Sequence, residues 1–148
     1  MSVPYASASS AKAREEITKI LRRFGCTSVG FMDDFEKHEV LLAFHHRGRP
    51  VQLRASAKGW AALWLKENPH THRHRISKRD YELGALRQGQ QAVNSILRDW
   101  IKGQVTAIET GILSFEAVFM PHMLLGDGRT VLGFLNENNL LPNEKGPA

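Results

Sequence analysis

The regular spacing of apolar residues between Tyr81 and Ile108 constrains the fold of this 148-residue chain more than any other feature. Apolar residues recur there at positions 85/86, 92/93, 96/97, 100/101 and 105. This spacing is typical of one face of an α-helix, and Ser77 with Asp80 has the form of a capping box at its start. The pattern predicts one helix over residues 78–109, roughly 45 Å long. Such a helix extends beyond a small sheet, so we expect its far end to meet a partner helix or a second copy in a homodimer.

The preceding segment predicts a helix, three strands and a second helix. "AKAREEITKILRRFG" follows Ser9 and Ser10, which can cap a helix, and it ends at Gly25. "CTSVGFM", "HEVLLAFHH" and "VQLRAS" are typical of strands, and the middle one is apolar on both faces. "SAKGWAALWLKENP" predicts a helix capped by Ser56, with Trp60 and Trp64 covering the sheet.

These patterns predict an α+β fold with a three-stranded antiparallel sheet. After the long helix, "FEAVFMPHML" predicts a shorter helix capped by Ser114, and "TVLGFL" a last short element. The predicted parts are a flexible tail (1–10), an α-β-β-β-α unit (11–68), a basic histidine-rich loop (69–77), a helical half that packs on the same domain or on a partner (78–135) and a second tail (136–148).

Composition narrows the cellular setting. The sequence contains no run of eighteen apolar residues that could span a membrane. "MSVPYASASS" lacks the basic and apolar regions of a secretory signal. The single cysteine, Cys26, excludes an intramolecular disulfide framework. We therefore expect a cytoplasmic protein without a membrane partner.

Charge is distributed unevenly along the chain. The formal net charge is +5, with 15 Lys and Arg against 7 Asp and Glu in residues 1–79, and 5 against 8 in the remainder. A basic half joined to an acidic half favours a polyanionic partner, although the charge can also serve solubility alone.

The basic residues concentrate at predicted turns and helix starts. The predicted phosphate contacts are Arg47, Arg49, Arg54, Lys58, Arg73, Arg75, Lys78 and Arg79. If both helices of the N-terminal unit pack on one sheet face, the Arg47–Arg49 turn and the Lys58 helix start share one edge. Reversing the charges of Arg47 and Arg49 should then weaken binding to all sequences alike.

The alternating histidines of "PHTHRHRISKRD" are a second candidate site. His70, His72 and His74 would share one side of an extended chain and could chelate a transition metal. Structural zinc usually needs four ligands, and no cysteine pair accompanies these three. We therefore favour a mobile loop and expect no metal or other cofactor.

A nuclease is the enzymatic alternative. The predicted order of helix, strands and helix is similar to the start of the restriction-endonuclease-like core, which binds Mg²⁺ through carboxylates on its second and third strands. The corresponding candidates are Asp34, Glu39 and Gln52. The chain departs from that pattern, because Arg54 stands where the core has a lysine and guanidinium cannot take its proton-transfer role.

Two further resemblances bear on function. The α-β-β-β-α order with "RASAKGWAALWL" resembles double-stranded-RNA-binding domains, which recognise duplexes by shape and phosphate contacts. The stretch "ETGILSFEAVF" and the later "GDGRTV" resemble small uncharacterised bacteriophage and prophage proteins. That resemblance implies a bacterial host and a role in phage DNA metabolism or host interference.

The leading interpretation is a non-catalytic nucleic-acid-binding protein that uses its basic N-terminal half. The alternative from another class is a phage protein-interaction module that inhibits a host enzyme. The sequence does not discriminate DNA from RNA, or single from double strands.

Overall fold

The structure is a computed structural model that describes residues 3–142. The chain forms α1 (Ser10–Phe24), β1 (Cys26–Asp34), β2 (Glu39–His46), β3 (Arg49–Ser56), α2 (Lys58–Glu67) and α3 (Lys78–Glu109), then α4 (Phe115–Phe119), a 3₁₀ turn (Met120–His122) and α5 (Val131–Glu137). The predicted α+β fold is confirmed.

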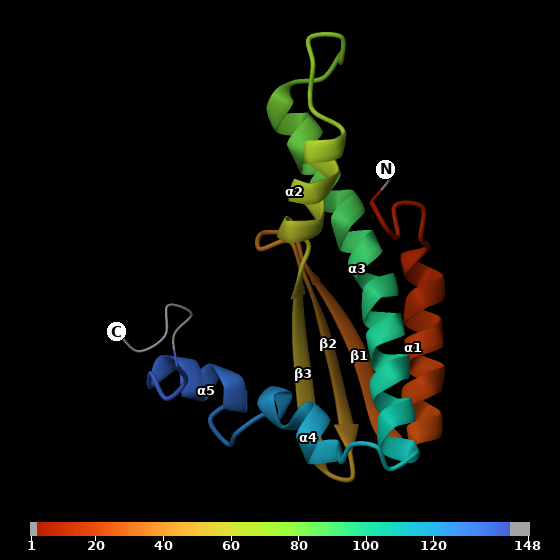
Figure 1. The fold of residues 1–148 in the computed structure, drawn as a ribbon, viewed down its shortest axis with the longest axis vertical. Helices are drawn as coiled ribbons and strands as arrows, with labels where there is room; N and C mark the ends of the chain where they lie inside the picture. The colour runs from red at the N-terminus through yellow and green to blue at the C-terminus, as the bar shows by residue number, and fades with distance from the viewer. Residues whose placement is uncertain (1–2, 143–148) are drawn as a thin grey trace.

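The sheet is an antiparallel meander in the order β1-β2-β3. Arg47 and Gly48 connect β2 to β3 with φ values of 51° and 77°, the backbone form of a two-residue hairpin turn. The turn between β1 and β2 lies at the opposite end of the sheet, near the start of α1 (Figure 1). Residues from the two turns are therefore separated by the length of the strands.

Helices α1 and α3 pack against each other and against one face of the sheet (Figure 1). Ile17 and Leu21 of α1 are fully buried with Val40, Leu42 and Phe44 of β2. Burying one such side chain stabilises the fold by about 1.5–3 kcal/mol. Helix α4 closes the lower end of this core, where the ring centroids of Phe119 and Phe44 are 5.4 Å apart.

The middle strand β2 is apolar on both faces and central in the sheet, as predicted, but only its inner face is buried. Val40, Leu42 and Phe44 are buried, but Leu41 and Ala43 on the other face are only partly covered. Gly30 and Met32 of β1 and Arg54 of β3 are exposed on this same outer face. No helix among residues 3–142 packs over it as α1 and α3 do over the inner face, so the fold has two layers here.

Helix α2 corrects an expectation, because it does not lie on the sheet. It packs along the part of α3 that extends beyond the sheet (Figure 1). Trp60 is buried against Val3 and Ala92 in a separate cluster, so it does not cover the strands. The end of α3 that extends beyond the sheet therefore packs against α2, a helix of the same chain. Ser56 is still in β3, and Ala57 is the N-cap residue of α2.

The first described residues also differ from the expected flexible tail. Val3 is buried, the indole nitrogen of Trp60 donates to the carbonyl of Pro4 (2.9 Å), and the amide of Gln88 donates to the carbonyl of Ala6 (3.0 Å). This segment therefore closes the α2–α3 interface. At the other end, α5 extends to Glu137, and the expected tail falls partly outside the described residues.

Candidate nucleic-acid interface

The connection between α2 and α3 forms the tip of a helical hairpin that projects beyond the sheet (Figure 1). Ser77 caps α3 by accepting a hydrogen bond from the backbone of Asp80 (3.1 Å), as predicted. The hydroxyl of Tyr81 donates to the carbonyl of Asn68 (2.6 Å) and joins the two ends of the connection. These bonds give the loop a defined conformation.

Aromatic rings order the same loop from within. The ring centroid of Tyr81 lies 4.5 Å from that of His74, 5.2 Å from that of His70 and 5.6 Å from that of Trp64. His74 Nδ1 accepts a hydrogen bond from the backbone of Thr71 (2.9 Å), and His70 Nε2 lies 2.9 Å from the carbonyl oxygen of Ile76. The loop that we expected to be mobile therefore packs around Tyr81 through ring contacts and backbone hydrogen bonds.

Four cations occupy this tip. Arg73, Arg75, Lys78 and Arg79, here called the tip cluster, are all exposed. Within the described part of the chain, none of them lies within 4.0 Å of a carboxylate as an ion pair. No acidic residue occurs between Pro69 and Arg79, although Glu67, Asp80 and Glu82 flank the segment. The tip cluster is thus a compact region of positive charge.

The other predicted phosphate contacts are dispersed. Arg47 is exposed in the β2–β3 turn, at the opposite end of the sheet from the start of α2 (Figure 1). Arg49 is bound to the carboxylate of Glu116 and lies 3.9 Å above the ring of Phe115. The expected common edge of Arg47, Arg49 and Lys58 does not form, because β3 runs about 24 Å between the two ends.

Arg54 and Lys58 lie between the tip cluster and the β2–β3 turn. Arg54 projects from the outer sheet face and pairs with Glu39 at 3.8 Å. Lys58 is exposed in the first turn of α2, and the ten residues of this helix place it about 15 Å from the tip. The eight predicted contacts thus divide into the tip cluster and four separate positions.

The three histidines of the loop do not converge. His70 and His74 stack at 5.2 Å and are hydrogen-bonded to the backbone, whereas His72 takes no part in this stack. Over residues 3–142, no group of three or more His, Cys, Asp or Glu side chains is arranged to hold a metal ion.

The nuclease candidates share the outer sheet face without forming one group. Asp34 lies opposite Glu39, but Gln52 lies opposite Ala43, four residues and about 14 Å further along β2. Asp34 accepts hydrogen bonds from the backbone of Lys37 (2.9 Å) and Glu36 (3.0 Å), which lower the pKa of its carboxyl group. Asp34 therefore stabilises the β1–β2 turn.

A polar cluster between α1, β1 and α3 was not predicted. The Arg14 guanidinium donates to Asp33 Oδ1 (2.7 Å) and Asn94 Oδ1 (2.8 Å). The Gln90 amide donates to Asp33 Oδ1 (3.3 Å) and to the carbonyl of Glu39 (3.1 Å). Asn94 and Gln90 are 1% and 6% exposed. These residues come from sequence positions up to 80 apart, so no local pattern indicates the cluster.

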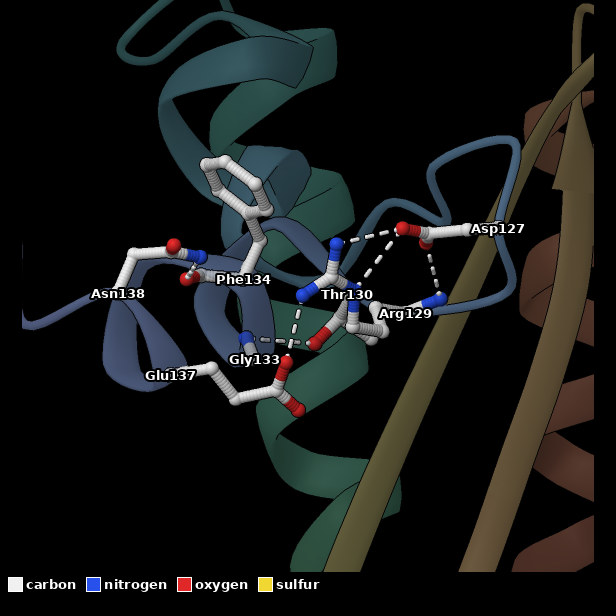
Figure 2. Close-up of polar contacts among 7 residues, drawn as sticks. All are labelled: Asp127, Arg129, Thr130, Gly133, Phe134, Glu137 and Asn138. Carbon is white, nitrogen blue, oxygen red and sulfur yellow. Dashed lines mark hydrogen bonds and ion pairs between the residues drawn. The ribbon is translucent and has the colours of Figure 1, made fainter.

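The "GDGRT" segment is a structural turn. Figure 2 shows the Arg129 guanidinium between the carboxylates of Asp127 and Glu137, with the shortest N–O distance 2.6 Å to each. Thr130 caps α5 by accepting from the backbone of Gly133 (3.0 Å). These contacts hold residues 123–142, the C-terminal arm, in shape beside β3, where Leu124 donates to the carbonyl of Pro50 (2.9 Å).

Comparison of the chain with protein-family models, with curated proteins and with solved structures gave no match. In the segment from 3 to 142, no helix combines the length and the apolar character needed to cross a bilayer.

Proposed function

We propose that this protein binds nucleic acid without cleaving it, and that the tip cluster makes the principal phosphate contacts. The observation that carries this proposal is the exposure of four cations on a projecting helical hairpin, none of which forms an ion pair with a carboxylate of residues 3–142. Long cationic side chains in such a position can reach phosphates on a strand or duplex. We place this activity in the cytoplasm of a bacterium, with a phage or prophage as the source of the gene.

The position of the cations on α3 supports an anionic partner. Lys78 and Arg79 stand in the first turn of a helix of 32 residues. The helix dipole is positive at this end and disfavours each cation by about 0.3–1 kcal/mol. A bound phosphate interacts favourably with both the cations and the dipole, which offsets this unfavourable arrangement.

Two double variants of equal charge test the proposal. Arg73→Gln with Arg75→Gln removes two positive charges from the tip cluster. Arg22→Gln with Arg23→Gln removes two exposed charges from the last turn of α1, at the other end of the molecule. Binding of labelled single- and double-stranded DNA and RNA is measured by fluorescence anisotropy at several salt concentrations, with Mg²⁺ and a gel of the products.

The tip variant should bind more weakly to every sequence. The plot of log affinity against log salt concentration should become less steep, its slope decreasing in magnitude by about 1.4–1.8 for two lost phosphate contacts. The nucleic acid should remain intact. The control variant should keep the wild-type slope. Equal losses in both variants would show that net charge alone attracts the polymer, and cleaved products would favour the nuclease alternative.

A protein partner is the second candidate, and the C-terminal arm is the observation that favours it. None of the residues of α5 is buried. Leu125, Leu132, Leu140 and Leu141 of the arm are 37–60% exposed, and Ile112 before α4 is 75% exposed. Apolar surface of this kind is typical of protein interfaces. A tight complex with one host protein, formed without any nucleic-acid binding, would favour this alternative.

A further inference from the structure

A cavity of about 260 Å³ opens beside the polar cluster, between α1, the end of β1 and α3. Arg14, Asp33 and Gln90 lie on its inner side, and Phe35, Arg87 and Gln91 also line it. Sites for drug-sized ligands span about 300–1,000 Å³. The cavity therefore suits a smaller group.

The inner side of the cavity is fixed before any ligand arrives. Asp33 Oδ1 accepts hydrogen bonds from Arg14 (2.7 Å) and Gln90 (3.3 Å). No hydrogen bond to Asp33 Oδ2 occurs among the described residues, so this oxygen can accept one from a ligand. Arg14 is held in turn by Asn94 and lies over the ring of Phe31 at 5.1 Å. Such a side can offer a carboxylate acceptor and amide groups to the polar edge of a ligand.

Phe35 gives the cavity an aromatic wall. Its side chain is 74% exposed, although it is a large apolar group. The turn that carries it is held by the hydrogen bonds from the backbone of Glu36 and Lys37 to Asp34 Oδ1. The turn therefore fixes the backbone of Phe35 at the cavity, and the exposed ring is open to stacking by a second flat ring.

Arg87 connects the cavity to the tip cluster. It is exposed, and it lies eight residues after Arg79 on α3, about 12 Å along the helix. No carboxylate of the described chain pairs with it. A strand that contacts the tip cluster can therefore extend along α3 to a phosphate contact at Arg87.

We propose that this cavity receives one unstacked nucleobase of a single-stranded nucleic acid. The base stacks on Phe35, Asp33 and Gln91 hydrogen-bond its polar edge, and Arg87 contacts the adjoining phosphate. Unstacked bases are bound in this way by aromatic rings and polar side chains in single-strand-binding proteins. This proposal rests on the proposed function, because the bound nucleic acid supplies the base. The same side chains can also bind the base of a free mononucleotide.

The variant Phe35→Ala tests the cavity site independently of the tip cluster. Affinities are measured by anisotropy for a single-stranded oligonucleotide and for a duplex of the same length. We expect Phe35→Ala to weaken single-strand binding about tenfold, to leave duplex binding unchanged and to keep the salt slope, because no phosphate contact is lost. Ile112→Ala removes a comparably exposed apolar side chain elsewhere and should change neither affinity. Equal effects of Phe35→Ala on strand and duplex, or none, would contradict the site.

Mononucleotides give a readout that does not depend on polymer binding. The four 5′-mononucleotides are titrated into ¹⁵N-labelled protein, and the amide shifts of Phe35, Gln90 and Gln91 are followed. Shifts at these residues without any polymer binding would support the cavity as a free-nucleotide site and contradict the proposed function. Polymer binding that is insensitive to Phe35→Ala, without such shifts, would overturn the base site and leave the proposed function standing.

Discussion

At the scale of single residues, His46 stands out because its imidazole ring is enclosed by aromatic side chains. Its centroid lies 4.2 Å from the Phe24 ring and 4.8 Å from the Phe115 ring, both nearly parallel to it. The residue is 5% exposed, and its buried Nδ1 has no hydrogen-bond partner within residues 3–142. Burial lowers the pKa of His46, and the nearby charges of Arg47 and Arg49 lower it further.

His46 should therefore make the protein less stable in mild acid. An imidazole with a lowered pKa in the folded state takes up its proton more readily after unfolding, so the free energy of unfolding falls as the pH drops below about 6.5. The loss can reach about 1.4 kcal/mol per pH unit for one such proton. Urea denaturation at pH 7.5 and 5.5 should show a smaller acid loss for His46→Phe than for the wild type.

His45→Gln is the matched control, because His45 is the exposed neighbour on the same strand. His122, whose pKa burial also lowers, contributes equally to all three proteins. An acid loss that is unchanged in His46→Phe would refute this assignment.

At the scale of elements, the contact between α2 and α3 depends on a residue without a side chain. A Cβ atom on Gly89 would lie 3.0 Å from the carbonyl oxygen of Ala57 and 3.2 Å from the ring of Trp60. On Gly103 of the same helix, a Cβ atom would meet no atom within 4 Å. The glycine at position 89 therefore lets α2 approach the projecting part of α3.

Alanine at these two positions should have opposite consequences. Gly103→Ala should raise the free energy of unfolding by about 0.5–1 kcal/mol, since alanine favours the helix. Gly89→Ala should lose that gain or become destabilising, because α2 must shift away. Urea denaturation of both variants measures the difference, and an equal gain at both positions would contradict the close packing.

The sequence predicts helix ends better than it predicts helix partners. The caps at Ser9, Ser77 and Ser114 were all identified, because each rests on a hydrogen bond to a residue three positions away. The position of α2 was predicted wrongly. Its apolar residues suit a sheet or another helix equally, and the choice depends on Gly89, more than twenty residues further on.

The same distinction applies to the candidate sites. The four cations of the tip cluster were among the eight predicted phosphate contacts, and they lie in one loop because they are consecutive or nearly so in the chain. The cluster of Arg14, Asp33 and Asn94 was missed, since α1, β1 and α3 bring it together only in the folded protein. The remaining predicted cations lie apart, because the length of β3 separates the residues at one end of the strand from those at the other.

At the scale of the whole molecule, the proposed function depends on which end of the structure faces the nucleic acid. The tip cluster lies at one end of the long axis, and the β2–β3 turn with Arg47 lies toward the other (Figure 1). Residues 80–148 contain more acidic than basic residues, 8 against 5. A nucleic acid guided by charge should therefore approach the helical hairpin and not the C-terminal arm.

The most direct test is to map the contact surface on the ¹⁵N-labelled protein as single-stranded and duplex oligonucleotides are added near physiological salt. We predict that the largest amide shifts fall within residues 69–87, with single strands also shifting Phe35. Shifts confined to residues 45–49 or 112–142, or no shifts at all, would contradict nucleic-acid binding through the tip cluster.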